Sequence, residues 1–325
     1  MPATIWTNFE PKPAARALLV SGLAPGGHRL IQSTQSSRSV LTPGGRDPAL
    51  AEADIAFGQP DPAGILDNPR LRWVALSTAG YTRYDTDAFR AAMRERGTVV
   101  TNTSAVFANP CAEHLLAQML AGARELPKHF RNQAGPHAWP YLEGRYSIRT
   151  LSETTVVILG FGAIGRRLVE LLAPFRCRVI AVRRSPRGDE GIETVTGDAL
   201  PPVLARADHV VDILPESPAT RWFFNAARFS QMRRGASFYN IGRGSTVQQD
   251  DLRAALVSGQ VGEAWLDALD PEPLPPEHPL WTTPNCHLTP HVGGGHREQD
   301  ENLVRHFLAN LQRFARDEPL VDRIG

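Results

Sequence analysis

The chain has 325 residues, of which 42% are hydrophobic, and its formal net charge is +1. This length predicts two domains of ordinary size, and the balanced charge gives no indication of a nucleic-acid or membrane partner. The start of the chain lacks the pattern of a signal peptide, and no apolar run reaches membrane-spanning length. The cysteines, Cys111, Cys177 and Cys286, are scattered and form no metal-ligand pattern. The composition therefore predicts a cytoplasmic protein.

Short apolar runs alternate with turn-rich segments in the first part of the chain. Candidate strands cover residues 4–7, 30–33, 54–57, 73–77 and 98–101, and residues 66–71 and 85–96 have helical or loop character. Strands that alternate with helices predict a mostly parallel sheet with helices on both faces.

A long helix is predicted next. Asn109 suits the N-cap position and Pro110 the first helical position. One broad apolar stripe follows, formed by Ala112, Leu115, Leu116, Met119, Leu120 and Ala123. Residues 127–149 then carry Pro, His, Trp and Tyr without periodicity, which predicts an irregular arm. Such an arm is typical of a subunit interface, and the alternative is a loop packed on its own domain.

Residues 155–165 read Thr-Val-Val-Ile-Leu-Gly-Phe-Gly-Ala-Ile-Gly, in the order strand, glycine turn and helix start. Gly160 permits the turn, Gly162 lets the backbone approach a pyrophosphate, and Gly165 lets helix and strand pack closely. The N–H groups at the helix N-terminus suit phosphate. A second apolar strand at residues 179–182 completes the unit, so this segment predicts a dinucleotide-binding site.

Arg183, Arg184 and Ser185 follow that second strand. A site that prefers NAD commonly has a carboxylate there, about 20 residues beyond the glycine turn. Guanidinium groups and a hydroxyl instead suit a 2′-phosphate, because arginine binds phosphate in a planar fork. The sequence predicts a preference for NADP(H), with NAD(H) possible. A solvated basic loop is the alternative reading.

Further strands are predicted at residues 208–214, 237–240, 263–267 and 287–289, and a final helix at 299–314. Arg243, Glu272 and His291 lie just beyond the last three of these strands. Ligands bind at the carboxyl ends of parallel strands, where an arginine can polarise a carbonyl and a histidine can exchange protons near neutrality. Each residue also has a simpler explanation when it is considered alone: Arg243 as a surface residue of a turn, Glu272 as a solvated loop residue and His291 as a structural histidine.

An ordered set of segments resembles the D-isomer-specific 2-hydroxyacid dehydrogenases. The matching residues are Ala79-Gly80, Ala112-Glu113-His114, the glycine motif at 159–165, Leu214-Pro215 with Thr220, Asn240-Ile241-Gly242-Arg243-Gly244, Asp267 with Glu272-Pro273, Pro279-Leu280-Trp281 and Thr289-Pro290-His291. The resemblance covers residues 71–295, and residues 1–70 add only a compatible pattern.

The expected fold is two doubly wound α/β domains with parallel sheets. A Rossmann dinucleotide-binding domain, residues 104–290, is inserted in a flavodoxin-like substrate domain, residues 1–103 and 291–325. The final helix is expected to return to the substrate domain.

The resemblance implies that Arg243, Glu272 and His291 form the catalytic set. His291 would be the general acid for carbonyl reduction, Glu272 would orient its imidazole and stabilise the cation, and Arg243 would hold the 2-oxo acid. Backbone N–H groups around Ala79 and Gly80 would receive the substrate carboxylate, and Trp281 would line the substrate site.

The same resemblance, with the motifs above, assigns the cofactor site and implies no metal. The predicted cofactor-binding residues are Gly160, Gly162, Ala163, Ile164, Gly165, Arg183, Arg184, Ser185, Leu214, Pro215, Thr220, Ile241 and Asp267. Asp267 would contact the nicotinamide carboxamide.

Thr82 departs from the family, which often has Asp at this position, so the substrate is not fixed by the motifs. The leading hypothesis is an NADPH-dependent reductase of glyoxylate or hydroxypyruvate, acting as a homodimer. One alternative is a non-enzymatic, dinucleotide-sensing corepressor, and another is an NAD-preferring dehydrogenase of the phosphoglycerate type. A formate dehydrogenase is disfavoured because those enzymes carry Gln where Glu272 stands.

Overall fold

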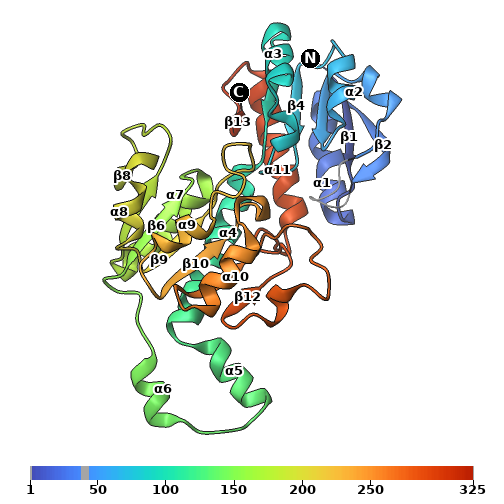
Figure 1. The fold of residues 1–325 in the computed structure, drawn as a ribbon. Coiled ribbons are helices and arrows are strands. Elements are labelled where there is room, and N and C mark those ends of the chain that lie inside the picture. Colours follow the sequence, from blue (N-terminus) through green and yellow to red (C-terminus); the bar gives the residue numbers. More distant parts are fainter. Residues whose placement is uncertain (1, 38–43, 325) are drawn as a thin grey trace. The chain divides into compact units, whose positions relative to one another are not determined.

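The computed structural model describes residues 2–37 and 44–324 and contains two compact units. The first unit comprises Met1–Phe107 and His296–Gly325, and the second comprises Ala108–Gly295. Each unit has its own sheet with helices on both sides, and the C-terminal helix α11 lies among the elements of the first unit (Figure 1). The expected boundaries, at 103/104 and 290/291, fall a few residues earlier than these.

The sheet of the first unit has the strand order β13-β5-β4-β3-β1-β2. All neighbouring strands are parallel except β13, which runs antiparallel to β5. Without β13 this is the flavodoxin-like order. The strands are β1 (Thr4–Phe9), β2 (Arg29–Ser37), β3 (Ile55–Gly58), β4 (Trp73–Leu76), β5 (Val99–Thr101) and β13 (Arg323–Ile324). The helices are α1 (Pro13–Leu23), α2 (Pro62–Asp67), α3 (Asp87–Arg96) and α11 (Gln299–Ala315).

Alternation along β1 divides the core of this unit between the two faces of the sheet. Ile5 is buried on the face that also buries Leu19 of α1 and Phe307 of α11. Trp6 is buried on the other face, with Ile65 of α2 and Phe89 of α3. The C-terminal helix therefore completes the N-terminal domain, as predicted.

The sheet of the second unit has seven parallel strands in the order β12-β11-β10-β9-β6-β7-β8. This is the Rossmann order, and the strand order reverses between β6 and β9. The strands are β6 (Thr155–Leu159), β7 (Arg178–Val182), β8 (Glu193–Val195), β9 (His209–Asp212), β10 (Ala236–Asn240), β11 (Val261–Leu266) and β12 (Cys286–Leu288). The helices are α4 (Ser104–Ala123, which starts in the first unit), α5 (Leu126–Ala134), α6 (Tyr141–Ser147), α7 (Ala163–Leu172), α8 (Leu200–Leu204), α9 (Ala226–Ser230) and α10 (Gln249–Val257).

The predicted start of the long helix is wrong. Helix α4 begins at Ser104, and Pro110 lies inside it. Asn109 does not cap the helix, because its side chain donates to Glu113 Oε1 (2.6 Å) and accepts from Arg167 Nε (2.7 Å). The first turn is instead satisfied by Asp322, whose Oδ2 accepts a hydrogen bond from Ala105 N (2.8 Å).

The prediction that the arm is irregular is also wrong, because residues 126–134 form helix α5 and residues 141–147 form helix α6. Leu126 and Phe130 are four residues apart on α5 and both are exposed, so the helix carries an apolar face that is not covered. A short helix with so few apolar residues gives too little periodicity to be recognised from sequence.

Candidate active site

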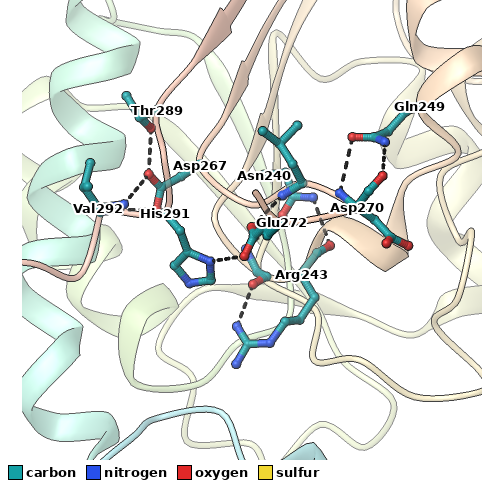
Figure 2. Close-up of polar contacts among 12 residues, drawn as sticks. Asn240, Arg243, Gln249, Asp267, Asp270, Glu272, Thr289, His291 and Val292 are labelled. Atoms are coloured by element: carbon teal, nitrogen blue, oxygen red, sulfur yellow. Dashed lines mark hydrogen bonds and ion pairs between the residues drawn. The ribbon is translucent and has the colours of Figure 1, made fainter. Parts of the chain in front are cut away.

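The three predicted catalytic residues follow adjacent strands. Arg243 follows β10, Glu272 lies in the segment after β11, and His291 lies three residues after β12. Since β10, β11 and β12 are neighbours in a parallel sheet, their carboxyl ends share one edge. Figure 2 shows the His291 ring pointing toward Glu272, with Arg243 beside them.

His291 and Glu272 form a hydrogen-bonded pair. His291 Nδ1 lies 2.8 Å from Glu272 Oε2, and the other carboxylate oxygen accepts from Leu269 N (2.8 Å). Burial raises the pKa of Glu272, but the hydrogen bonds from His291 and Leu269 and the charges of His291 and Arg243 outweigh it and hold that pKa below its ordinary value. Glu272 is therefore an anion near neutrality. His291 Nε2 has no hydrogen-bond partner within residues 2–37 and 44–324 and is available to a substrate.

The loop that carries His291 is held by Asp267. The Asp267 carboxylate is buried and accepts hydrogen bonds from Val292 N (2.9 Å), Gly293 N (2.8 Å) and Thr289 Oγ1 (2.6 Å). His291 has a φ of 53°, a left-handed conformation that few non-glycine residues adopt. Its own N–H donates to the carbonyls of Asp267 and Thr289, 3.0 Å from each. Asp267 thus acts as an anchor for this loop, and its predicted contact with nicotinamide stays a prediction.

Two further residues of α4 join this network. His114 Nε2 lies 3.2 Å from Thr289 Oγ1, and Gln118 Nε2 lies 2.8 Å from His114 Nε2. The sequence placed His114 among the family motifs without a role, because its contact with Thr289 joins residues 175 positions apart in the chain. Gln118 joins the network only through His114, one helical turn away, and the sequence did not single it out.

Arg243 lies in a tight turn. Its Nη1 donates to Gly242 O (2.8 Å), and its carbonyl accepts from Asn240 Nδ2 (3.0 Å). A side chain at Gly244 would place Cβ 1.9 Å from the backbone carbon of Leu269, so only glycine fits there. Burial lowers the pKa of Arg243, and the charge of Glu272 opposes that change. The guanidinium keeps its proton in any case and can bind an anionic or carbonyl oxygen.

The glycine turn fits a dinucleotide. Gly160 has a φ of +91°, and a Cβ there would lie 2.7 Å from Ile213 O. Gly165 packs against Phe161, 3.1 Å from the position of a Cβ. Gly162, the N-cap of α7, has open space where a Cβ would be. Ala163 and Ile164 form the first turn of α7, where N–H groups have no partner within the helix. In the described part of the chain no other group accepts from them, so they are available to a phosphate.

The predicted 2′-phosphate residues differ in availability. Arg183 Nη1 donates to Glu190 Oε1 (2.7 Å), and the Glu190 side chain is only 3% exposed. Glu190 also accepts from Arg187 N (2.7 Å) and Gly188 N (2.8 Å). Arg183 is therefore held inside its own loop by a residue that the sequence did not single out. Arg184 and Ser185 are exposed and have no partner in the described part of the chain.

The remaining predicted cofactor residues lie beyond β9 and β10. Thr220 Oγ1 donates to Pro215 O (2.6 Å), which folds the loop containing Leu214 back on itself. Ile241 is buried, and its Cδ1 would lie 2.6 Å from a Cβ at Gly293. This loop starts beside the point where the strand order of the second sheet reverses, which is where nucleotides bind in such folds.

Two of the predicted substrate residues, Ala79 and Gly80, follow β4 in the first unit. Their carbonyls are fixed, because Asn102 Nδ2 donates to Ala79 O and Thr78 Oγ1 donates to Gly80 O, each at 2.8 Å. Their N–H groups donate to no acceptor among the described residues. Trp281 belongs to the second unit. It is half exposed, and its indole N–H is already bonded to Pro275 O (2.9 Å).

Within the described ranges, no three His, Cys, Asp or Glu side chains are grouped as a metal site would require. The helices of the same ranges include none that is both long and apolar enough to span a bilayer.

Comparison with known proteins identifies the family. The profile of the D-isomer specific 2-hydroxyacid dehydrogenase NAD binding domain matches residues 116–293. A human glyoxylate reductase/hydroxypyruvate reductase is 34% identical over 233 residues, 70% of each chain. The glyoxylate/hydroxypyruvate reductase B of Citrobacter koseri is 31% identical over 268 residues, 81% of each chain.

Solved structures agree with this result. A D-isomer specific 2-hydroxyacid dehydrogenase from Xanthobacter autotrophicus, in complex with NADPH and MES, is 28% identical with a TM-score of 0.80, covering 100% of this chain and 98% of that one. An NADPH-dependent glyoxylate/hydroxypyruvate reductase from Sinorhizobium meliloti, in complex with NADP and sulfate, is 27% identical with a TM-score of 0.78, covering 99% and 98%. The chain therefore belongs to the D-isomer specific 2-hydroxyacid dehydrogenases, a family of NAD(P)-dependent oxidoreductases.

Proposed function

We propose that the protein reduces a small 2-oxo acid of the glyoxylate or hydroxypyruvate type to the D-2-hydroxy acid, with NADPH as the reductant. The observation that carries this proposal is the pair of His291 and Glu272, 2.8 Å apart, on the same sheet edge as Arg243. A proton donor, its anionic partner and a fixed cation are the groups that reduction of a 2-oxo acid needs.

Each catalytic residue has a separate task in this proposal. The nicotinamide cofactor, when bound, supplies the hydride for C2 of the substrate. His291 Nε2 donates a proton to the carbonyl oxygen, and Glu272 stabilises the imidazole while it is protonated. Arg243 attracts the developing negative charge on that oxygen and the substrate carboxylate. The backbone N–H groups of Ala79 and Gly80, which donate to no acceptor among the described residues, are the proposed receptors of a substrate carboxylate.

NADPH is the proposed cofactor because Arg184 and Ser185 are exposed and unpartnered at the end of β7, within the described residues. Both could contact a 2′-phosphate. The complexes of the Xanthobacter and Sinorhizobium relatives contain NADPH and NADP, which supports the same choice. Use of NADH is the alternative.

We also infer that the segment of α5 and α6, the arm, forms the interface of a homodimer. Trp139 is 90% exposed and Tyr146 is 80% exposed, and Phe130, Tyr141 and Leu142 are exposed beside them in sequence. The arm also lines a cavity of about 730 Å³. Apolar patches of this kind on a single chain mark sites where another surface binds.

The test is a panel of initial rates with NADPH and with NADH, each combined with glyoxylate, hydroxypyruvate, pyruvate and a bulkier 2-oxo acid. We expect the highest kcat/KM when NADPH is combined with glyoxylate or with hydroxypyruvate. Tight NADPH binding without turnover of any 2-oxo acid would contradict the proposal and favour a dinucleotide-sensing protein.

A further inference from the structure

Asp212, the last residue of β9, is a buried carboxyl group that the proposed mechanism does not use. Its relative exposure is 0%. Oδ1 accepts a hydrogen bond from Leu214 N (3.0 Å), and Oδ2 lies 2.6 Å from Thr246 Oγ1. No lysine, arginine or histidine in the described part of the chain forms an ion pair with it. A carboxylate buried without a cation is costly, so its protonation state needs an explanation.

The hydroxyl of Thr246 supplies that explanation. Its oxygen lies 2.6 Å from Asp212 Oδ2 and also 2.6 Å from the carbonyl oxygen of Arg243. A hydroxyl has one proton. If Asp212 is ionised, both neighbours are pure acceptors and one of the two short contacts has no proton in it. If Asp212 is protonated, it donates to Thr246, and Thr246 donates to Arg243 O.

We propose that Asp212 works as a neutral carboxylic acid that donates a hydrogen bond to Thr246 and thereby positions the turn that carries Arg243. Asp212 is a positioning residue in this scheme, since it acts through Thr246 and touches no substrate. The functional consequence rests on the proposed role of Arg243 in holding the 2-oxo acid.

The surroundings of Asp212 favour the neutral form. Its strand neighbours are Leu159 on β6 and Asn240 on β10, and neither can titrate. The charged side chains on the loops that follow β9 and β10 are Glu216, Arg221 and Arg243. Burial raises the pKa of Asp212, the hydrogen bonds from Thr246 and Leu214 oppose that rise, and the resulting pKa is about 7. Ionisation therefore begins near neutral pH and leaves two acceptors competing for one proton.

The first test compares the KM for the 2-oxo acid across the pH range about 6 to 8 in the wild type and in Asp212→Asn, at saturating NADPH. Asparagine keeps the shape, donates an N–H to Thr246 and cannot ionise. We expect the ratio of the wild-type KM to the variant KM to increase roughly two- to tenfold between the low and the high end of this pH range. This is the fold-change that corresponds to the loss of one neutral hydrogen bond. Effects of His291 occur in both proteins and cancel in the ratio.

Two substitutions at Thr246 provide the matched controls. Thr246→Val removes the relay and should raise KM at every pH, whereas Thr246→Ser keeps the hydroxyl and should behave as the wild type. A large loss of substrate affinity in Asp212→Asn at pH about 6, where the wild type is proposed to be neutral, would overturn the proposal. So would a normal KM in Thr246→Val.

The second test needs no substrate and is therefore independent of the proposed function. The folded-state pKa of Asp212, about 7, is above that of an unfolded aspartate, so the folded protein holds a proton that the unfolded chain releases. The contribution of Asp212 to the free energy of unfolding should fall as pH rises from about 4 to about 7 and then level off. We expect the difference in urea midpoint between the wild type and Asp212→Asn to follow this curve. Parallel curves for the two proteins would show that Asp212 does not carry the proton.

Discussion

His291 is the residue on which the proposed chemistry depends most. Replacement by Asn keeps a polar side chain near Glu272 but removes the proton donor, so reduction should slow by roughly 10²–10⁴-fold. Initial rates measure this loss, and fluorescence titration should show unchanged NADPH binding. His137→Asn is a matched control, because His137 has nearly the same φ, 54° against 53°, but lies in the exposed arm. Near-normal turnover in a folded His291→Asn protein would remove His291 from the mechanism.

Glu272 should determine the pH range in which the enzyme reduces its substrate. The carboxylate is ionised near neutrality, because hydrogen bonds and charge hold the pKa of Glu272 below its ordinary value, and an anion at this distance stabilises the protonated imidazole. Reduction should fall as pH rises and the imidazole loses its proton. In Glu272→Gln the anion that stabilises the protonated imidazole is gone, so that fall should occur at lower pH than in the wild type. An unchanged midpoint of kcat against pH would show that the pair does not act in the reaction.

Arg184 should determine the preference for NADPH. A charge-assisted hydrogen bond to the 2′-phosphate contributes about 1.5–3 kcal/mol, so Arg184→Ala should weaken NADPH binding roughly 10- to 100-fold. NADH binding should barely change, and the loss should shrink at high salt. Michaelis curves for both cofactors measure these effects. Equal losses for NADPH and NADH would identify the residues after β7 as a solvated basic loop.

Arg183 provides a second comparison at the same loop. Its guanidinium is bonded to Glu190 inside the loop, so Arg183→Ala should lower stability along with NADPH affinity. Thermal unfolding without cofactor should show a lower unfolding temperature for Arg183→Ala and an unchanged one for Arg184→Ala. A loss of cofactor preference confined to Arg183→Ala, with Arg184→Ala normal, would reverse the assignment.

At the scale of the element, two glycines of one turn should respond differently to alanine. Gly160 has a positive φ and no room for a Cβ beside Ile213 O, so Gly160→Ala should lower the unfolding temperature. Gly162 has a φ of −98° and open space around it, so Gly162→Ala should leave stability unchanged and weaken NADPH binding. Thermal unfolding and cofactor titration of both variants check this. A destabilised Gly162→Ala protein would mean that the open space is not a phosphate site.

The sequence predicted the elements whose signals are local. The glycine motif, the predicted strands of both sheets and the returning C-terminal helix depend on short patterns of apolar and glycine residues, and all are present. The short edge strands β8 and β13 were not predicted. Helix α4 begins six residues earlier than predicted, because Asp322 near the other end of the chain satisfies its first turn. Helices α5 and α6 were missed because their apolar residues face outward and give no core pattern.

The candidate site also contains residues that local sequence signals identify and residues whose roles depend on contacts in the folded chain. Arg243, Glu272 and His291 could be named from their places after strands and from the family resemblance. The roles of Asp267, Gln118 and Glu190 could not, because each depends on a contact made by the folded chain. The loop of Glu190 is the clearest case. In the sequence the arginines from Arg183 to Arg187 suggest a basic loop, and only the folded chain shows that Glu190 is buried and bonded to Arg183.

At the scale of the whole molecule, the exposed arm should hold two chains together. Trp139 and Tyr146 are 90% and 80% exposed, and large aromatic side chains of this kind commonly dominate interface energies, at about 2 kcal/mol or more each. The double variant Trp139→Ala with Tyr146→Ala should therefore weaken self-association by roughly 10²-fold or more. Light scattering over a dilution series measures the change, with Val257→Ala, an exposed apolar residue outside the arm, as the control. A wild type that is monomeric at all concentrations, or a double variant that dimerises as the wild type does, would show that the arm does not form the interface.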